Sequence, residues 1–332
     1  MKQVLYWGII GVGDVCEVKS GPAFNKIEGS RLIGVMRRSA SLAKEYALRH
    51  AVPKWYDDAD ALIHDPEINA IYIATPPHVH PYYVKKVAAA GKIVYVEKPM
   101  ANSYAECLEM IAACEKNNVP LFVAYYRRAL ANFIAIKKWI EDGTIGSVRF
   151  VDIKVHRSMK KDLELIRNNK ENWRTDPDIA GGGYFNDLAC HQLDIMDWLF
   201  GPIKSARGIS LNQAGLYKAD DLVLGQFEFE SGIAGQGAWC FTTSENAEKE
   251  MTTIYGSKGI LSFPFFGDHS VTIHLDGKLP QTHAFDMPVH IQLPLIQSIV
   301  DDAMGMGICP STGTTAARTN KIMEMILATK TI

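Results

Sequence analysis

Short apolar runs alternate with amphipathic stretches over the first third of the chain. Five runs are bounded by turn or cap residues and predict strands at Val4–Ile10, Arg31–Met36, Ala70–Ala74, Ile93–Val96 and Leu121–Ala124. Between them, helical spacing occurs in Ser39–Ala51, Pro81–Ala90 and Ser103–Asn117. Repeated strand–helix–strand units force parallel pairing with right-handed crossovers. We therefore expect an α/β fold that begins with a doubly wound parallel sheet.

The pattern changes after residue 124. One predicted helix (residues 130–142) leads into a strand at 147–156, then a polar, poorly periodic segment at 159–178 and a helix at 183–199. Six runs separated by turn residues then predict an antiparallel sheet, with strands at 205–211, 222–229, 233–241, 249–255, 260–263 and 270–275. Helices at 291–304 and 314–328 follow. We expect two domains, residues 1–124 and 125–332.

Composition narrows the function classes. With 332 residues the chain is longer than one hydrophobic core usually organises. Its 35 basic and 37 acidic residues give a net charge of −2, which argues against nucleic acid as the partner. No apolar run approaches the roughly 20 residues of a membrane helix, so we expect no membrane partner either. Six cysteines without a C-x-x-C pair predict reduced thiols and a cytoplasmic location.

A glycine turn follows the first predicted strand. Gly11 and Gly13 lie where the strand gives way to a helix that opens with Asp14 and Val15. Small residues there let the backbone approach a pyrophosphate, which the helix N-terminus stabilises. Cys16 replaces the Gly or Ala usual at the third position, but it is small. Tight glycine turns also occur for packing reasons. Within a strand–helix–strand unit, the pattern favours a dinucleotide-binding site.

The end of the second predicted strand indicates which dinucleotide binds. A carboxylate at this position would bind the ribose hydroxyls of NAD, but none occurs between Ser30 and Lys44. Arg37, Arg38 and Ser39 stand there instead and suit a 2′-phosphate. We therefore expect NADP to be preferred, with NAD as an alternative. The alternative is an exposed basic pair that ends the strand, which is common in proteins, but its position here favours the phosphate-binding role.

Two further strand ends carry polar residues. Glu97, Lys98 and Pro99 follow the strand at 93–96, where ligands bind in open α/β sheets. The lysine can hydrogen-bond a substrate hydroxyl and stabilise alkoxide charge. Taken alone, however, this residue is better explained as a solvated lysine at a strand end. A Pro-rich turn from Thr75 to His80 follows the strand at 70–74, and its histidines are most simply loop residues.

A third candidate is on the helix predicted at 183–199. Asp187 and His191 are spaced i, i+4 and share a face, so the carboxylate can orient the imidazole as a general base. Asp194 continues that face, which makes a metal site a rival that we discount because no further ligand has suitable spacing. An ordinary polar helix face is the remaining alternative. Arg174, in the preceding polar segment, can reach a ligand.

These motifs occur together in one known family. The glycine turn, Thr-Pro-Pro-x-x-His at 75–80, Glu-Lys-Pro at 97–99 and Gly-Gly-Gly-x-x-x-Asp-x-x-x-His-x-x-Asp at 181–194 appear in that order. The chain thus resembles the Gfo/Idh/MocA oxidoreductases over essentially its whole length. The resemblance implies an N-terminal Rossmann domain and a C-terminal α/β domain. The latter would have a large, mostly antiparallel open sheet that forms homodimers or homotetramers. It also implies that Pro99 follows a cis peptide bond.

The resemblance also assigns roles to residues. The catalytic residues would be Lys98, Asp187 and His191. The cofactor-binding residues would be Gly11, Gly13, Asp14, Val15, Arg37, Arg38, Ser39, Thr75, Pro76, His80, Glu97 and Lys98. The substrate-binding residues would be Lys98, Tyr126, Arg127, Arg174, Asp187 and His191, with no metal ion.

The implied activity is NAD(P)-dependent hydride transfer to or from a hydroxyl or keto carbon of a sugar, polyol or dihydrodiol. Two alternatives stay open. One is a catalytically silent, nucleotide-binding regulator, and the other is an NAD-dependent, redox-assisted glycosidase on the same scaffold. The presence of Lys98, Asp187 and His191 together speaks against the regulator.

Overall fold

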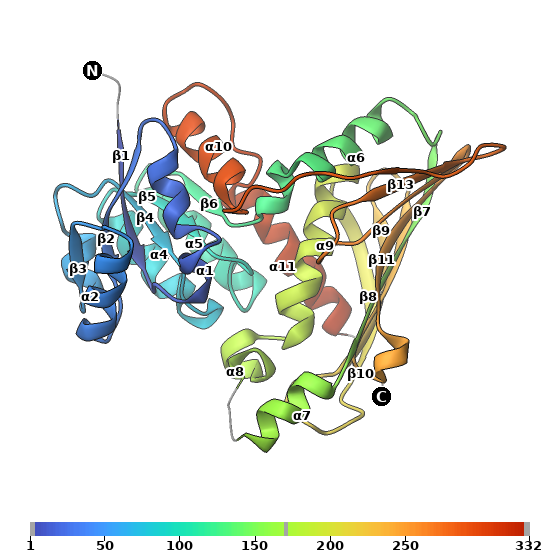
Figure 1. The fold of residues 1–332 in the computed structure, drawn as a ribbon, viewed down its shortest axis with the longest axis horizontal. Helices are drawn as coiled ribbons and strands as arrows, with labels where there is room; N and C mark the ends of the chain where they lie inside the picture. Colours follow the sequence, from blue (N-terminus) through green and yellow to red (C-terminus); the bar gives the residue numbers. More distant parts are fainter. Residues whose placement is uncertain (1–3, 169–171, 329–332) are drawn as a thin grey trace. The chain divides into compact units, whose positions relative to one another are not determined.

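The structure is a computed structural model that describes residues 4–168 and 172–328. The chain forms two compact units. Unit 1 comprises Met1–Ala129 and Pro288–Ala317, and unit 2 comprises Leu130–Met287 and Arg318–Ile332. This division differs from the single break expected after residue 124, because a segment near the C-terminus packs with the first unit. Each unit is built around its own sheet (Figure 1).

Unit 1 contains the doubly wound sheet. Its six strands are all parallel and have the order β3-β2-β1-β4-β5-β6. The strands are β1 (Leu5–Ile10), β2 (Ser30–Met36), β3 (Lys54–Tyr56), β4 (Ala70–Ile73), β5 (Ile93–Val96) and β6 (Leu121–Val123). Five of them confirm the sequence prediction within one residue at either end. The edge strand β3 was not expected, because its three residues are partly exposed and form no apolar run.

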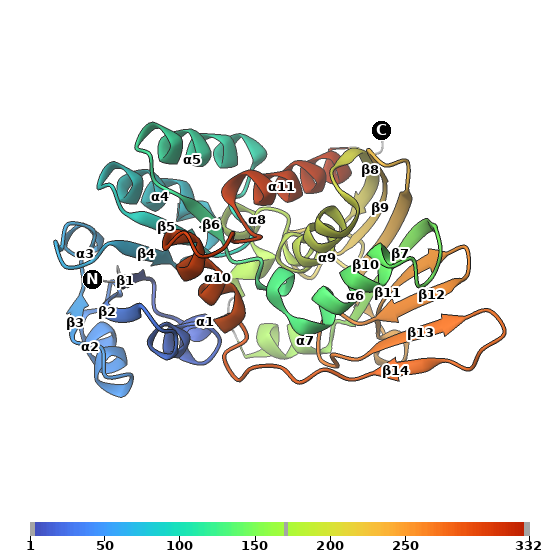
Figure 2. The ribbon, with the colours of Figure 1, turned by 90° about the horizontal axis from the view of Figure 1, so that it is seen from above.

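Helices cover this sheet. They are α1 (Asp14–Glu17), α2 (Ala40–Arg49), α3 (Ala59–Ile63), α4 (His80–Ala89), α5 (Tyr104–Lys116) and α10 (Leu293–Ala303), with 3-10 helices η1 (Gly21–Lys26), η2 (Pro77–Val79) and η3 (Tyr126–Ala129). The helices α4 and α5 lie side by side (Figure 2). At the start of α5, Ser103 accepts a hydrogen bond from the Glu106 amide, and the Glu106 side chain accepts one from the Ser103 amide. This reciprocal cap satisfies two amides that the helix leaves without partners.

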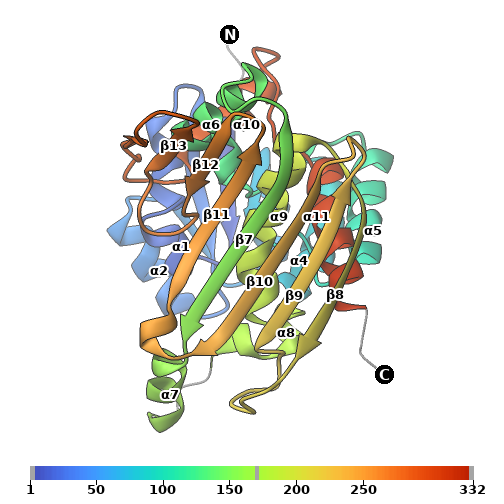
Figure 3. The same cartoon turned by 90° about the vertical axis from the view of Figure 1, so that its right-hand side faces the viewer.

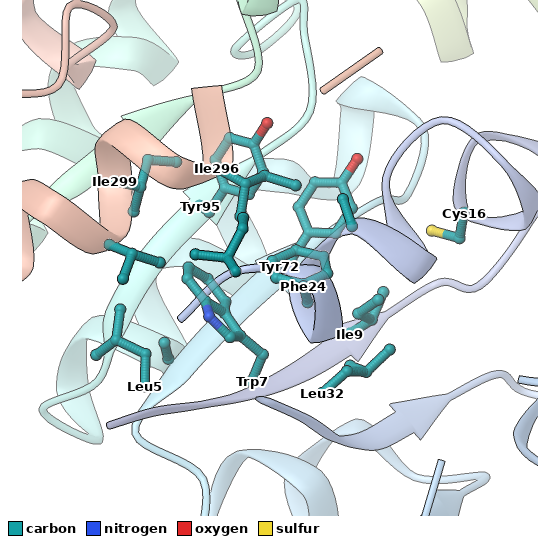
Figure 4. Packing of buried hydrophobic residues seen from close by; sticks show 14 of the residues in the cluster. Leu5, Trp7, Ile9, Cys16, Phe24, Leu32, Tyr72, Tyr95, Ile296 and Ile299 are labelled. Atoms are coloured by element: carbon teal, nitrogen blue, oxygen red, sulfur yellow. The ribbon is translucent and has the colours of Figure 1, made fainter. Parts of the chain in front are cut away.

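The core of unit 1 joins the sheet to α10. Trp7 and Phe24 are in ring contact, and the rings of Tyr72 and Tyr95 stack with their centroids 4.7 Å apart (Figure 4). One face of α10 packs onto these rings through Leu295, Ile296, Ile299 and Val300, which are all fully buried. Full burial of each such side chain contributes roughly 1.5–3 kcal/mol. This apolar packing explains why residues 288–317 belong to unit 1.

Unit 2 contains a larger, mostly antiparallel sheet (Figure 3). Its eight strands have the order β14-β13-β12-β11-β7-β10-β9-β8. They are β7 (Val148–Ser158), β8 (Ile203–Leu211), β9 (Leu222–Phe229), β10 (Ala234–Thr243), β11 (Lys249–Gly256), β12 (Gly259–Phe263), β13 (Val271–Leu275) and β14 (Gln281–His283). β7 lies in the middle and pairs in parallel with β10. The exposed strand β14 was not predicted from the sequence.

The remaining helices are α6 (Ala131–Glu141), α7 (Lys160–Arg167), α8 (Pro177–Ala180), α9 (Tyr184–Phe200) and α11 (Gly313–Leu327), with 3-10 helices η4 (Trp173–Thr175) and η5 (Glu245–Ala247). They belong to unit 2, except that α11 begins in unit 1 and passes into unit 2 at Arg318. Both α9 and α11 lie against one face of the eight-stranded sheet, which we call its inner face; the opposite face is its outer face (Figures 1 and 3). A Cβ on Gly208 or Gly225 would lie within about 3.3 Å of Ile326, so glycine allows α11 to approach closely. The described residues of the poorly periodic segment at 159–178 contain α7, η4 and the start of α8.

Within the described residues, no helix combines the length and the apolar character needed to cross a membrane.

The reciprocal cap of α5 gives a stability prediction. Replacing Ser103 by Ala leaves the Glu106 amide without its acceptor and should lower the free energy of unfolding by about 1 kcal/mol. Equilibrium urea denaturation measures this change. Ser41→Ala is the matched control, because Ser41 is exposed in the first turn of α2 and is not the capping residue of that helix. Equal stability of the two variants would contradict the capping assignment.

Candidate active site

The glycine turn follows β1 in unit 1. Gly11 has φ +92°, and a Cβ there would lie 2.8 Å from Thr75 Cγ2, so no larger residue fits. A Cβ on Gly13 would meet nothing closer than 4.0 Å, so its bare backbone borders open space. The helix that follows, α1, has only four residues. The turn thus offers backbone amides to a phosphate without a long helix behind them.

Strand order places this turn at the switch point of the sheet. β1 and β4 are the central pair, and the strand order reverses direction between them. The amides of Gly11 and Val12 both donate to the Met36 carbonyl, so the turn is tied to the end of β2. Dinucleotides bind at this place in open α/β sheets.

The residues predicted to bind the 2′-phosphate of NADP follow directly after Met36. Arg37 and Arg38 are exposed and follow Met36, the last residue of β2. The Arg37 amide donates to the Tyr56 carbonyl, which fixes the backbone while the guanidinium stays in solvent. Ser39 precedes α2, and its hydroxyl lies 3.0 Å from that of Ser41. Two cations and a hydroxyl therefore border the glycine turn.

The turn after β4 contributes a buried hydroxyl group, that of Thr75. The Thr75 hydroxyl oxygen is buried and has no hydrogen-bond partner within residues 4–168 and 172–328. A buried hydroxyl without a partner is costly unless a ligand or water satisfies it. Because the Thr75 methyl group faces Gly11, this hydroxyl lies beside the glycine turn. The residues of this edge therefore fit a dinucleotide.

His80 has a different environment from the one that the sequence suggested. Its ring is fully buried, and Nε2 and Nδ1 lie 2.8 and 3.1 Å from the carbonyl oxygens of Thr75 and Met100. Burial lowers the pKa of His80. Because both ring nitrogens face backbone carbonyls, His80 holds the turn that carries Thr75 and Pro76.

Glu97 and Lys98 follow β5 at the same edge. Lys98 is half-buried, and its peptide bond to Pro99 is cis, as the resemblance implied. Glu97 is buried, and one carboxylate oxygen accepts hydrogen bonds from the Tyr72 hydroxyl and the Gln292 side chain. Its other oxygen accepts from the Lys98 amide. The sequence analysis missed Tyr72 and Gln292, because neither belongs to a local motif.

The segment after β6 is largely buried. Arg128 donates to the Pro310 carbonyl and the Thr315 hydroxyl, so it holds the segment to the C-terminal part of unit 1. Arg127 donates to the Tyr126 hydroxyl, and its guanidinium lies 4.9 Å from the centre of that ring. Tyr126 is the more exposed of this last pair.

In unit 2, α9 carries the predicted acid–base pair. Asp187 and His191 are one turn apart on this helix, as the sequence predicted, and His191 is only 4% exposed. One Asp187 carboxylate oxygen accepts from Arg174 Nε at 3.1 Å. The Arg174 guanidinium in turn lies over the Trp173 ring. Unit 2 therefore brings Arg174, Asp187 and His191 into one region.

A second polar cluster lies at the start of the same helix. The Tyr184 hydroxyl donates to Asp162 at 2.5 Å and accepts from the Asn172 side chain. Burial raises the pKa of Asp162 above its usual range. Asn172 is the residue before η4, so its hydrogen bond to Tyr184 joins η4, which contains Arg174, to the first turn of α9. The sequence analysis missed it because the segment at 159–178 shows no clear periodicity.

The described residues contain no group of three or more His, Cys, Asp or Glu side chains arranged to hold a metal ion. Asp194, the third member of the considered metal set, is fully buried and accepts a hydrogen bond from Thr319 of α11.

Comparisons with known proteins place this arrangement. Residues 5–125 match the family described as "Oxidoreductase family, NAD-binding Rossmann fold", and residues 133–262 match the "GFO/IDH/MocA C-terminal domain". The chain is 37% identical over 329 residues to Oxidoreductase P35 of Formosa agariphila, covering 99% of this chain and 100% of that protein. It is 27% identical to trans-1,2-dihydrobenzene-1,2-diol dehydrogenase of Xenopus laevis, covering 85% of this chain and 81% of that protein.

Among solved structures, levoglucosan dehydrogenase in complex with NADH and levoglucosan has the same fold. The TM-score is 0.85 at 21% identity, covering 98% of this chain and 97% of that one. The matching family descriptions, together with a relative that aligns over its full length, confirm the resemblance based on the motifs. The chain belongs to the Gfo/Idh/MocA family of oxidoreductases, with an NAD-binding Rossmann fold in its first unit.

Proposed function

We propose that this enzyme is an NADP-preferring dehydrogenase that oxidises a hydroxyl group of a sugar, polyol or dihydrodiol, or catalyses the reverse reduction. The observation that carries the proposal is the pair of Asp187 and His191 on one face of α9, with a lysine at the β5 end of the nucleotide-binding sheet. A regulator that only senses nucleotide has no need of a proton acceptor. The relatives named for a dihydrodiol and for levoglucosan support the hydroxyl-bearing substrate class.

Three side chains have separate roles in this proposal. His191 accepts the proton of the substrate hydroxyl, and Asp187 keeps the imidazole oriented for that transfer. The Lys98 ammonium hydrogen-bonds the same oxygen and stabilises its negative charge. When bound, the nicotinamide supplies the hydride acceptor. We propose that Arg174, which donates a hydrogen bond to Asp187, contacts the substrate. Tyr126 and Arg127 are proposed to contact it as well.

The preference for NADP rests on charge. Arg37 and Arg38 are exposed beside the glycine turn, and the stretch from Ser30 to Lys44 has no carboxylate to bind a free 2′-hydroxyl. Guanidinium groups bind phosphate through paired, charge-assisted hydrogen bonds. Ser39 supplies a further hydroxyl. Levoglucosan dehydrogenase, in contrast, was solved with NADH.

We further propose that the outer face of the eight-stranded sheet forms a homodimer or homotetramer. Ile209 and Leu224 are opposite each other on β8 and β9, and they are 43% and 40% exposed. Leu211 and Phe150 extend the exposed apolar surface on the same sheet. Burial of such a surface by a second copy stabilises the assembly.

The six free thiols support a reducing compartment, which we take to be the cytoplasm.

Activity tests the proposed catalytic roles. The enzyme should reduce NADP⁺ with at least one member of a panel of aldoses, polyols and trans-dihydrodiols, followed by absorbance. His191→Asn should lower kcat/KM by about 100-fold or more, because the proton acceptor is lost. His156→Asn, on β7 of unit 2, is the matched control and should keep wild-type activity. Silence of the wild type across the panel, with nucleotide still bound, would favour the regulator.

Cofactor choice is tested separately. Arg38→Ala should weaken NADP⁺ binding by about tenfold, because a charge-assisted hydrogen bond to the phosphate is lost, and should leave NAD⁺ binding unchanged. Isothermal titration with both nucleotides measures this difference. Arg31→Ala is the matched control, because Arg31 is equally exposed but lies at the start of β2. Unaltered NADP⁺ affinity in Arg38→Ala would contradict the phosphate assignment.

The sheet interface is tested by assembly. Leu224→Arg places a charge in the centre of the exposed apolar surface and should convert the oligomer to monomers in sedimentation velocity. Leu279→Arg should leave the assembly intact, because Leu279 is 87% exposed in the connection between β13 and β14. If Leu224→Arg assembles like the wild type, the interface lies elsewhere.

A further inference from the structure

Glu97 is a buried carboxylate that interacts with three donors of unit 1. Its Oε1 accepts from the Tyr72 hydroxyl at 2.5 Å and from Gln292 Nε2 at 2.7 Å. Its Oε2 accepts from the Lys98 amide at 3.1 Å. Glu97 is 8% exposed, and the hydrogen bonds offset the cost of removing its charge from water. The carboxylate therefore connects the backbone of the active-site lysine to the interior of the unit.

The chemistry of Glu97 determines which end of the Gln292 side-chain amide faces it. An ionised carboxylate only accepts hydrogen bonds, so the amide nitrogen of Gln292 must face Glu97. The amide oxygen then faces the Tyr95 hydroxyl, which donates to it at 2.7 Å. Gln292 is 1% exposed, and its own backbone amide donates to the Lys19 carbonyl. Both ends of this residue are thus fixed.

The two tyrosines remain donors in this environment. Burial, together with the negative charge of Glu97, raises the pKa values of Tyr72 and Tyr95 well above the usual range. Their stacked rings bring the two hydroxyls to the same side of the cluster (Figure 4). Tyr72 thus binds Glu97 directly, and Tyr95 binds it through the Gln292 amide.

We propose that Gln292 is a positioning residue for Lys98. It immediately precedes α10 and is separated from Glu97 by 195 residues in the sequence, yet it binds the Glu97 oxygen opposite the one that accepts from the Lys98 amide. Removing its donor leaves the buried carboxylate with one hydrogen bond fewer, so the carboxylate turns toward another partner and releases the Lys98 backbone. The inference rests on the proposed function in that Lys98 is taken as the lysine that binds the substrate oxygen.

Amide exchange tests the positioning role directly. In protein labelled with 15N-lysine, the Lys98 amide is assigned by its loss in Lys98→Arg, and its hydrogen exchange is followed by NMR. Gln292→Met keeps the side-chain length but removes the donor, and it should speed exchange at Lys98 by about tenfold. Gln297→Met is the matched control, because Gln297 is on the same helix and binds Asp301 instead. It should exchange like the wild type.

A charged variant keeps the test decisive if Gln292→Met does not fold. In Gln292→Glu a carboxylate replaces the amide that donates to Glu97, so the hydrogen bond is lost and like charges are brought together. Exchange at Lys98 should then increase relative to the wild type. Wild-type exchange rates in Gln292→Met or in Gln292→Glu would overturn the inference.

Kinetics then separate this inference from the proposed function. Gln292→Met should lower kcat by about tenfold, because the Lys98 ammonium is no longer held where it binds the substrate oxygen. The KM for NADP⁺ should change less than kcat, because Arg37 and Arg38, the proposed phosphate contacts, are not altered. An unchanged kcat would overturn the inference. If the wild type oxidises no substrate of the panel, the proposed function fails, but the exchange experiment still decides whether Gln292 holds the Lys98 backbone.

Discussion

The candidate site depends on one constraint of parallel sheets, which is that all strands end at the same edge. The ends of β1, β2, β4 and β5 therefore bring Gly11, Arg37, Thr75 and Lys98 to one edge of unit 1, although they are far apart in the sequence. The Met36 carbonyl ties the glycine turn to β2, and the close approach of Thr75 ties it to β4. Backbone pairing, rather than attraction among the polar side chains, positions this edge.

Buried charge is the second organising constraint. A carboxylate in a core needs donors on both oxygens, and Glu97 obtains them from Tyr72, Gln292 and the Lys98 amide. One of these donors comes from the segment before α10, whose apolar face packs on the same core. The position of a C-terminal segment is thereby connected to the backbone of a residue at the sheet edge. Packing energy from α10 holds a polar network in place.

In unit 2 the helix α9 combines two functions. Its interior face packs in the core of the unit, while Asp187 and His191 share one side of the helix. The carboxylate of Asp187 is paired with Arg174 from η4, and the Tyr184 hydroxyl joins that turn to α7. The proposed acid–base pair therefore stands on a packed helix that hydrogen bonds join to the segment preceding it.

The sequence by itself determined five of the six strands of the first sheet, the glycine turn and the one-turn spacing of Asp187 and His191. Each of these is set by neighbours within a few residues, so a local pattern contains the whole signal. Tertiary structure alone decided that the short strands β3 and β14 form, because neither has an apolar pattern of its own. It also placed His80 between two backbone carbonyls and Gln292 beside Glu97. Those contacts join segments that only the packed core brings together, and no local pattern encodes them.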